Sequence, residues 1–293
     1  MSQQWNRRKK MNMRAKASVE KKRFELTDDY KETIRNQSYL GKKGYTILRS
    51  SLSDEDQKIL HEELNVKPVT IGPVYNAQTD QGAFPVYREN AKKIYIPRFY
   101  GIERYGLPNR SEITQGEDIN VEFPKSLRDY QDKIVDVYMN HVKKPICVGS
   151  EKIGNGGILE VPCGRGKTVM ALKIISLIQK KTLIIVHKEF LMNQWIDRAA
   201  EFLPGAHIGK IQGPVFDVEG KDIVIGMLQT LYDRALPENA FDCFGLTIID
   251  EVHRIGSEQF SKTLLRVVSP NMLGISATVD RKDKLTCVLY MFI

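Results

Sequence analysis

The chain has 293 residues, of which 42% are hydrophobic and 27% charged, and its formal net charge is +8. These are ordinary values for a globular protein with a buried core, and the length suffices for one large domain or two modest ones. No apolar run approaches the roughly 20 residues that cross a bilayer, the basic N-terminus lacks the apolar stretch of a secretory signal, and the four cysteines form no C-x-x-C pair. We therefore expect an intracellular protein without a membrane partner, a disulfide framework or a zinc site.

The positive charge is concentrated at the N-terminus. Residues 1–23 contain nine Lys and Arg residues against one Glu, which accounts for the whole net charge and leaves the remainder formally neutral. Such a run predicts a disordered basic tail. The tail could hold nucleic acid loosely or serve as a nuclear address, and it could equally be a solvated end without a specific role.

Residues 24–120 predict a small α+β region. The segment "GYTIL" is typical of a short strand, and Ser53 then caps a helix whose apolar positions include Ile59, Leu60 and Leu64. The stretch "AFPVYRENAKKIYIPRFYGIERYGLP" is rich in β-formers and turn residues, which favours further strands. The polar segment "PNRSEITQGEDIN" after it is typical of a linker.

Aromatic and basic residues alternate within that second stretch. They could form a nucleic-acid-binding surface, but aromatic residues are enriched in strands anyway, so the core of a small sheet is the simpler interpretation. The residues concerned are Tyr87, Arg88, Lys92, Lys93, Tyr95, Arg98, Phe99, Tyr100, Arg104 and Tyr105.

The pattern changes from residue 121 onward. Five short apolar runs, "GGILEV", "TLIIV", "DIVIG", "LTIID" and "MLGISA", alternate with amphipathic helical patterns such as "KTVMALKIISLIQK" and "EFLMNQWIDRAAEF". Continuous apolar runs indicate strands that are covered on both faces. Residues 121–293 therefore predict an α/β fold, a doubly wound parallel sheet that binds ligands at the carboxyl ends of its strands.

A candidate phosphate loop, "VPCGRGKT", joins the first of these strands to the first helix. It departs from the pattern G-x-x-x-x-G-K-[ST] only at the first glycine, which is replaced by valine. The two glycines would let backbone N–H groups turn toward phosphate oxygens, the lysine would reach the β- and γ-phosphates, and the threonine hydroxyl would bind Mg²⁺. The alternative is a purely structural strand-to-helix turn. The predicted nucleotide-binding residues are Val161, Pro162, Cys163, Gly164, Arg165, Gly166, Lys167 and Thr168.

Two adjacent acids follow the buried strand "LTIID". Asp250 would hold Mg²⁺ directly or through water, and Glu251 would polarise the water that attacks the γ-phosphate. Acids at the end of an apolar strand are costly to bury without partners, so a nearby cation explains them better than an exposed strand terminus does. Glu251, Asp250 and Lys167 are the predicted catalytic residues.

Three segments in order, "PCGRGKT", "IIDEVH" and "SAT", resemble motifs I, II and III of superfamily 2 helicases. The DEVH box and the sequence around it are similar to the XPB/Rad25-like branch. The segments "GYTILRSSLSDEDQKILHEEL" and "KKIYIPRFYGIERYG" resemble helicases of large nucleocytoplasmic DNA viruses, a group that includes the poxvirus transcript-release helicase. An AAA+ ATPase fits less well, because "LRDYQ" precedes motif I and "SAT" follows the DEVH box.

The resemblance implies a RecA-like fold, ATP and Mg²⁺ as cofactors, and DNA or RNA as the partner, with transcription or repair machinery as further partners. A viral protein would work in the host cytoplasm, the virus factory or the virion, with the nucleus as an alternative. Gln131 in "LRDYQ" corresponds to the residue that reads the adenine edge. Arg128 would position that segment, although an ordinary helix-surface arginine explains it equally well.

The resemblance assigns two further groups of residues. Coupling of the γ-phosphate state to domain closure would fall to His253, Ser276 and Thr278, although the family's usual proline after "SAT" is Val279 here. Nucleic-acid contacts would come from Lys188 in "IIVHKEFLMNQW" and from Gln229 and Thr230 in "IGMLQTL", whereas Leu191 and Trp195 are interpreted as core.

Superfamily 2 enzymes hydrolyse ATP between two RecA-like lobes, and the second lobe supplies arginine fingers. The motifs of this chain stop at motif III, so we expect one lobe here and the second in cis downstream or in trans. The apolar end "CVLYMFI" favours a fragment or a split motor, since we expect it to be exposed without a following element. The isolated chain would then bind ATP–Mg²⁺ weakly and hydrolyse it poorly. The alternative is a non-catalytic ATP- and DNA-binding module.

Overall fold

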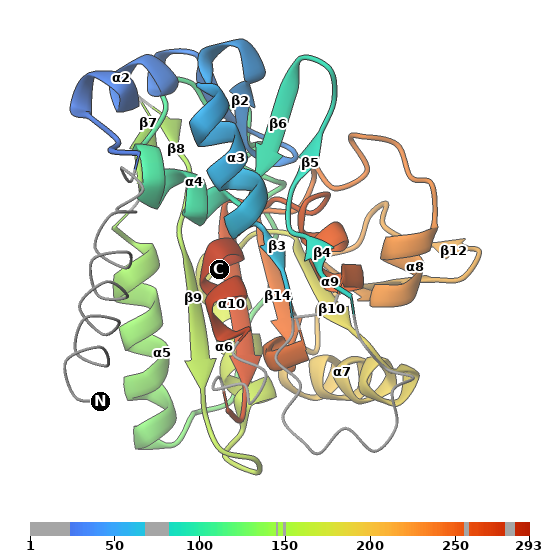
Figure 1. Ribbon diagram of the computed structural model, residues 1–293. Helices are drawn as coiled ribbons and strands as arrows, with labels where there is room; N and C mark the ends of the chain where they lie inside the picture. Colours follow the sequence, from blue (N-terminus) through green and yellow to red (C-terminus); the bar gives the residue numbers. More distant parts are fainter. Residues whose placement is uncertain (1–23, 68–81, 145, 149–150, 255–257, 279–284) are drawn as a thin grey trace, which may run out of the picture.

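The computed structural model describes residues 24–67, 82–144, 146–148, 151–254, 258–278 and 285–293. The predicted basic tail and Val279 lie outside these residues. Figure 1 shows a small N-terminal unit packed against one end of a larger sheet that carries helices on its faces. Among the described residues, no helix is both long enough and apolar enough to cross a membrane.

The larger sheet has seven strands in the order β12-β11-β13-β10-β14-β15-β9, and only β12 runs antiparallel to its neighbour. Both β10 and β14 are buried at every residue, as expected for strands covered on two faces. The strands are β9 (Gly156–Glu160), β10 (Thr182–Val186), β11 (Ile208–Gln212), β12 (Val215–Phe216), β13 (Ile223–Met227), β14 (Leu246–Asp250) and β15 (Asn271–Ser276).

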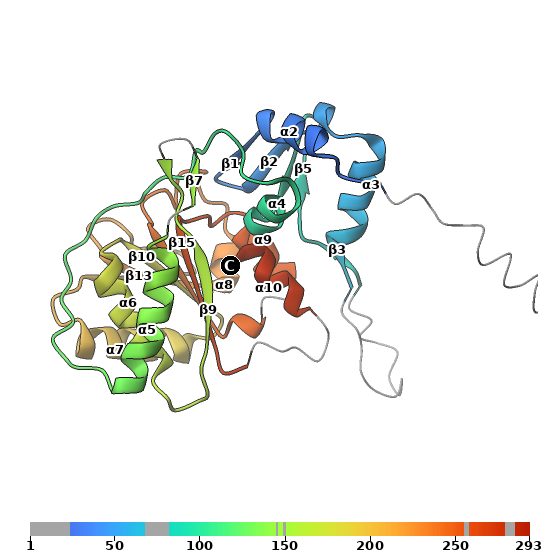
Figure 2. The same ribbon diagram turned by 90° about the vertical axis from the view of Figure 1, so that its left-hand side faces the viewer.

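Helices cover both faces of this sheet (Figure 2). One face carries α5 (Asp129–Val142), α6 (Lys167–Ile178) and α7 (Glu189–Phe202), and the other carries α8 (Leu228–Asp233), α9 (Glu258–Leu264) and α10 (Thr286–Phe292). Each face buries its own apolar cluster. The chain winds outward from β9 to β11 on one face and returns to β15 on the other, which confirms the predicted doubly wound α/β fold.

Two strands of the sheet were not among the predicted apolar runs. In β11, Lys210 is exposed between the buried residues Gly209 and Ile211. The strand is therefore not a continuous apolar run. In β12 there are only two residues. Both lie at the far edge of the sheet, where fewer neighbours cover the strands, and a criterion based on full burial misses them.

The N-terminal unit comprises the elements from α2 to α4. Its four-stranded sheet has the order β1-β2-β6-β5 and is antiparallel throughout. Ser53 caps α3 as predicted, accepting a hydrogen bond from the backbone N–H of Asp56. The elements are α2 (Asp28–Asn36), β1 (Ser38–Gly41), β2 (Gly44–Leu48), a 3₁₀ turn (Arg49–Ser51), α3 (Asp54–Glu63), β3 (Asn65–Val66), β4 (Phe84–Pro85), β5 (Arg88–Glu89), β6 (Lys93–Ile96) and α4 (Arg98–Tyr105).

The sequence predicted strands within residues 83–108. This was wrong for residues 98–105, which form the helix α4. Arg98, Gly101 and Tyr105 are its buried residues, and their spacing of three and four places them on one helical face. Gly101 lies directly against the Tyr45 ring, where a Cβ atom would approach a ring carbon to 2.3 Å. The aromatic content favours a strand, but the packing of the buried face of α4 against its neighbours stabilises a helix instead.

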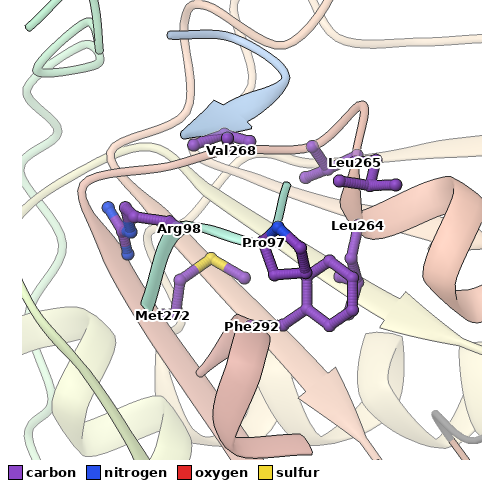
Figure 3. A pocket seen from close by; sticks show the side chains of 9 residues that line it. Pro97, Arg98, Leu264, Leu265, Val268, Met272 and Phe292 are labelled. Carbon is purple, nitrogen blue, oxygen red and sulfur yellow. The ribbon is translucent and has the colours of Figure 1, made fainter. Parts of the chain in front are cut away.

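Arg98 joins the N-terminal unit to the larger sheet (Figure 3). Its side chain is 4% exposed, and Nη1 donates to the carbonyl oxygens of Ile153, Ser269 and Pro270 at 3.4, 3.1 and 3.2 Å. These carbonyls lie just before β9 and β15 begin, so Arg98 is anchored at the amino end of the sheet. Burial lowers the pKa of Arg98 to about 10, which still leaves the guanidinium charged at neutral pH.

The apolar C-terminal segment is packed rather than exposed, which corrects the expectation from the sequence. Val288 and Leu289 in α10 are fully buried, and Phe292 and Ile293 are nearly so. They belong to the apolar cluster on the α8–α9 face of the sheet, and α10 also packs against α4. Only Cys287 and Tyr290 of this segment are exposed.

Candidate nucleotide site

The predicted nucleotide residues lie at the carboxyl ends of three adjacent strands, β9, β15 and β14. Strand β9 leads into the phosphate loop, β15 ends at Ser276, and β14 ends at Asp250. Ser276 is paired with Glu160 in the parallel register, and Asp250 is paired with Ile275. The backbone N–H of Val161 also donates to the Ser276 carbonyl at 2.9 Å. The sheet therefore brings all three predicted motifs to one edge.

The phosphate loop has the backbone conformation that its glycines allow. Gly164 and Gly166 have φ angles of +76° and +84°, in the left-handed region where side chains are strained. Gly166 lies immediately before α6, so the loop delivers its N–H groups to the start of a 12-residue helix. Gly164 has open space where a Cβ atom would be, and Lys167 opens the helix. Backbone donors at a helix N-terminus are suited to an anion.

Side chains from the start of α5 hold the loop from one side. The Tyr130 hydroxyl and Gln131 Nε2 each donate to the Arg165 carbonyl oxygen at 3.0 Å. Gln131 Oε1 accepts a hydrogen bond from the backbone N–H of Arg128, also at 3.0 Å. Gln131 thus contacts the phosphate loop, while Arg128 serves as the cap residue of α5.

Asp250 is a buried acid with two donors. Its carboxylate is 7% exposed; Oδ2 accepts from Trp195 Nε1 and Oδ1 accepts from the backbone N–H of Glu251, both at 2.9 Å. Burial raises the pKa of Asp250, and the Trp195 donor and the positive charge of Lys167 oppose that rise. Trp195 was interpreted as core only. It is buried, but its N–H also fixes the orientation of the acid that the sequence assigned to Mg²⁺.

The raised pKa of Asp250 makes a prediction for stability. The native state binds this proton more tightly than the unfolded chain does, so stability falls as pH rises through the native pKa. Asp250→Asn removes the titrating carboxyl and should flatten the dependence of Tm on pH above 4 for the ligand-free chain, although its amide leaves one of the two donors, Trp195 Nε1 or the Glu251 N–H, without an acceptor. Thermal unfolding at several pH values checks this result, with Asp233→Asn as an exposed control. A dependence of Tm on pH as steep for Asp250→Asn as for wild type would contradict it.

Glu251 and His253 form a polar relay with motif III. Glu251 has a φ of +52°, which costs a non-glycine residue roughly 1 kcal/mol. Its Oε2 lies 3.2 Å from His253 Nδ1, which is also 2.9 Å from Ser276 Oγ. The Ser276 hydroxyl donates to the Thr278 carbonyl oxygen at 2.6 Å. The three predicted coupling residues therefore form a chain of contacts that runs from Glu251 through His253 and Ser276 to Thr278.

The residues present fit a nucleotide with Mg²⁺. Glycines with positive φ let the loop turn its backbone N–H groups toward an anion. Lys167 lies within electrostatic range of Asp250, and Thr168 directly follows Lys167 at the start of α6. A buried carboxylate whose pKa is raised by desolvation is stabilised when a cation approaches. Lys167 Nζ has a weak contact with Cys163 Sγ at 4.0 Å, and both side chains are partly or fully exposed to solvent.

The predicted nucleic-acid residues lie on the neighbouring half of the same sheet edge. Lys188 precedes α7 and is exposed, with Nζ 5.7 Å from the ring centroid of Phe190, which is 61% exposed. Thr230 in α8 accepts a hydrogen bond from the Gly213 N–H at 2.9 Å, and Gln229 donates to Asp233. These residues follow β10 and β13 and flank the β11–β12 turn, beside the nucleotide residues but separate from them.

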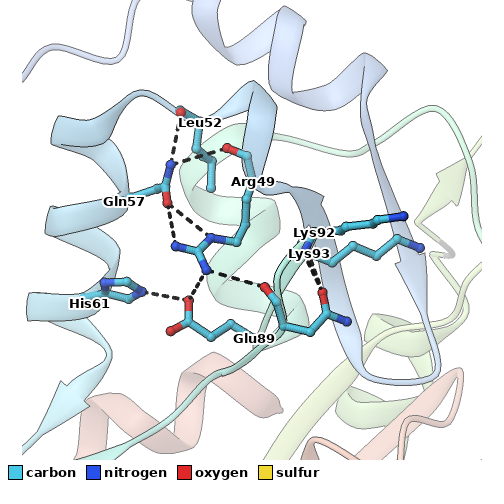
Figure 4. A network of polar contacts seen from close by, with 8 residues as sticks. Arg49, Leu52, Gln57, His61, Glu89, Lys92 and Lys93 are labelled. Carbon is cyan, nitrogen blue, oxygen red and sulfur yellow. Dashed lines mark hydrogen bonds and ion pairs between the residues drawn. The ribbon is translucent and has the colours of Figure 1, made fainter.

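The alternating aromatic and basic residues of the N-terminal unit do not form one surface. Tyr105 is buried, Arg104 is paired with Asp56, and Arg98 is enclosed at the junction with the larger sheet. Figure 4 shows a polar network beside them, in which Glu89 is 3.1 Å from His61 and 3.6 Å from Arg49. The interpretation as core and internal contacts therefore accounts for much of this pattern.

Comparison with known proteins gives a family match over more than half of the chain. The model of the family described as "Type III restriction enzyme, res subunit" matches residues 124–281. The chain is 33% identical over 240 residues to "Putative ATP-dependent RNA helicase L396" of Acanthamoeba polyphaga mimivirus, covering 82% of this chain and 45% of that protein. It is 31% identical over 196 residues to "DNA 3'-5' translocase XPB2" of Sulfurisphaera tokodaii, covering 64% and 39%. The chain thus spans less than half the length of these curated relatives.

Among solved structures, the UvsW helicase of bacteriophage T4 has a similar fold. The two structures match with a TM-score of 0.50 and 17% sequence identity, and the match covers 82% of this chain and 92% of that chain. At this identity the likeness concerns the fold alone.

Proposed function

Because the chain belongs to the family of the type III restriction enzyme res subunit and carries the first RecA-like lobe of a superfamily 2 helicase of the XPB-like and viral kind, we propose that it forms part of an ATP-dependent motor that moves on DNA or RNA. Residues 121–293 would be the ATP-binding lobe and residues 24–120 a region that contributes to nucleic-acid recognition. Transcription or repair is the process in which such a motor would act.

The observation that carries this proposal is the convergence of three motifs on one sheet edge. Backbone N–H groups of the loop and Lys167 would bind the phosphates, with Gln131 beside them for the adenine. Thr168 and Asp250 would hold Mg²⁺, which supplies charge neutralisation to the phosphates when bound. Glu251 would take a proton from the attacking water. The contact between His253 and Ser276 would pass the state of this site to motif III.

Binding of a fluorescent ATP analogue in the presence of Mg²⁺ tests the nucleotide site. Lys167→Ala should weaken binding by about 30-fold or more, because removing a charged partner of a buried phosphate costs at least ~2 kcal/mol. Lys173→Ala is a matched control in the same helix, since Lys173 lies over the Phe123 ring, 5.1 Å from its centroid. Equal affinities for wild type and Lys167→Ala would remove the phosphate loop from the proposal.

A further inference from the structure

A polar pocket lies at the junction of the N-terminal unit with the α8–α9 face of the larger sheet. It has a volume of about 220 Å³, and its apolar lining residues include Leu236 and Phe241. Since one water molecule takes up ~30 Å³ in the liquid, this junction pocket can hold a hydrated phosphate group but not a drug-sized ligand. Its charged lining residues are Lys42, Lys43, Arg88, Glu238 and Arg266.

The positive charges of the junction pocket are only partly compensated. Lys42 is paired with Asp242, and Lys43 with Glu238 at 2.7 Å. Among the described residues, no carboxylate lies within ion-pair distance of Arg88 or Arg266. Burial lowers the pKa of Arg88, and repulsion from the positive charge of Arg266 lowers it further.

Neutral backbone groups fix these two arginines in place. Arg88 Nη2 donates to the Lys262 carbonyl oxygen at 2.8 Å, and Arg266 Nη1 donates to that of Leu231 at 2.9 Å. Arg266 Nη2 donates to the Arg234 carbonyl oxygen at 3.1 Å. Backbone carbonyls therefore hold both guanidinium groups at the pocket without an ion-pair partner among the described residues, an arrangement that binds an anion with little ordering cost.

Helix α8 connects the junction pocket to the predicted nucleic-acid residues. Its first turn carries Thr230, and its last carbonyls accept from Arg266. A helix of six residues is about 9 Å long. One nucleic-acid strand advances about 3.4 Å per nucleotide, so this length corresponds to roughly three nucleotides. A strand that contacts Thr230 would reach the pocket within a short distance.

We propose that the junction pocket binds a backbone phosphate of the nucleic acid and so extends its path from the motor lobe onto the N-terminal unit. This inference rests on the proposed function, because it takes the strand to run past Thr230. Arg88 and Arg266 contact the phosphate, and Lys43 contributes once its exposed partner Glu238 turns away. The side chain of Glu238 is 80% exposed, so it is free to move.

The test measures binding of labelled single-stranded DNA and RNA oligonucleotides to the full 293-residue chain at several salt concentrations. Arg88→Gln should weaken binding several-fold and reduce the slope of log K against log salt by about 0.7, the value for one phosphate of a single strand. Arg110→Gln is the matched control, because Arg110 is an exposed arginine of the N-terminal region, 3.0 Å from Glu112. It should leave the slope unchanged. Contributions of the basic tail are the same in each variant and cancel.

A second variant has the opposite expected sign. Glu238→Gln removes the negative charge at the pocket and frees Lys43, so it should tighten oligonucleotide binding and steepen the salt slope. A merely structural role of the pocket would not give tighter binding, because this variant loses an ion pair. Unchanged slopes for both Arg88→Gln and Glu238→Gln overturn the proposal.

Two further measurements separate the alternatives. If inorganic phosphate raises the Tm of wild type but not of Arg88→Gln, while the oligonucleotide slopes are equal, the pocket binds free phosphate and the nucleic-acid assignment is wrong. The fluorescent ATP analogue is measured on the same variants and should bind each with equal affinity. If neither wild type nor any variant binds the analogue, the proposed motor function fails. The comparison of salt slopes still tests whether the junction pocket binds a backbone phosphate.

Discussion

Glu251→Gln is expected to lower the rate of ATP hydrolysis by about 10²–10⁴-fold while leaving ATP affinity nearly unchanged. The amide has the shape of the acid but cannot take the proton of the attacking water, and loss of a general base typically has this effect. The amide oxygen can still accept from His253, which lies 3.2 Å from Glu251 Oε2 in the native chain. The relay to Ser276 should therefore remain in place.

Single-turnover hydrolysis in the presence of nucleic acid measures this effect, because even slow conversion can then be followed. Glu160→Gln is the matched control, since Glu160 ends β9 at the same sheet edge and is exposed. It should hydrolyse ATP at the wild-type rate. If Glu251→Gln hydrolysed ATP within a few-fold of wild type, Glu251 would not be the base, and the assignment of the DEVH box would need another residue.

Arg98→Met should lower the free energy of unfolding by about 3–5 kcal/mol, more than any other variant named above. The methionine fills much of the same space, but the Ser269 and Pro270 carbonyl oxygens lose their buried donor. Each unsatisfied buried acceptor costs about 1–3 kcal/mol. Relief of the buried charge offsets part of this cost, but several stranded carbonyls outweigh it.

Thermal unfolding should show a Tm lower by on the order of 10 °C for Arg98→Met. Arg98→Lys keeps a charged donor, so its Tm should lie between those of wild type and Arg98→Met. Arg110→Met removes an exposed arginine and should change the Tm little. A Tm for Arg98→Met equal to that of wild type would mean that the junction with the amino end of the sheet contributes no stability.

The sequence was sufficient for five of the seven strands of the larger sheet because these strands are of one simple kind. Five continuous apolar runs mark these strands, of which β10 and β14 are buried at every residue, and the phosphate loop follows the first run. Strand β11 could not be found in this way, because Lys210 interrupts its apolar pattern at the edge of the sheet. Helix α4 was missed because Arg98 and Gly101, two of its three buried residues, carry no apolar signal.

The site was predictable in its motifs but not in its supporting contacts. The order of phosphate loop, DEVH box and "SAT" is visible along the chain, whereas the hydrogen bond from Trp195 to Asp250 joins residues 55 positions apart. A buried tryptophan has the same sequence pattern whether or not its N–H has a polar partner. The junction pocket was equally hidden, because it combines Arg88 with Arg266 across two regions of the chain.

The proposed role of Gln131 at the adenine edge would have a consequence for base selectivity. A carboxamide has two N–H donors and two acceptor lone pairs, and here one donor is used by Arg165 and one lone pair by Arg128. One donor and one acceptor remain, which complement the N7 and N6 positions of adenine, whereas guanine presents two acceptors there. Adenine could thus be distinguished from guanine while Gln131 keeps its hydrogen bond to the Arg165 carbonyl. The same amide would then contact both the base and the phosphate-binding turn.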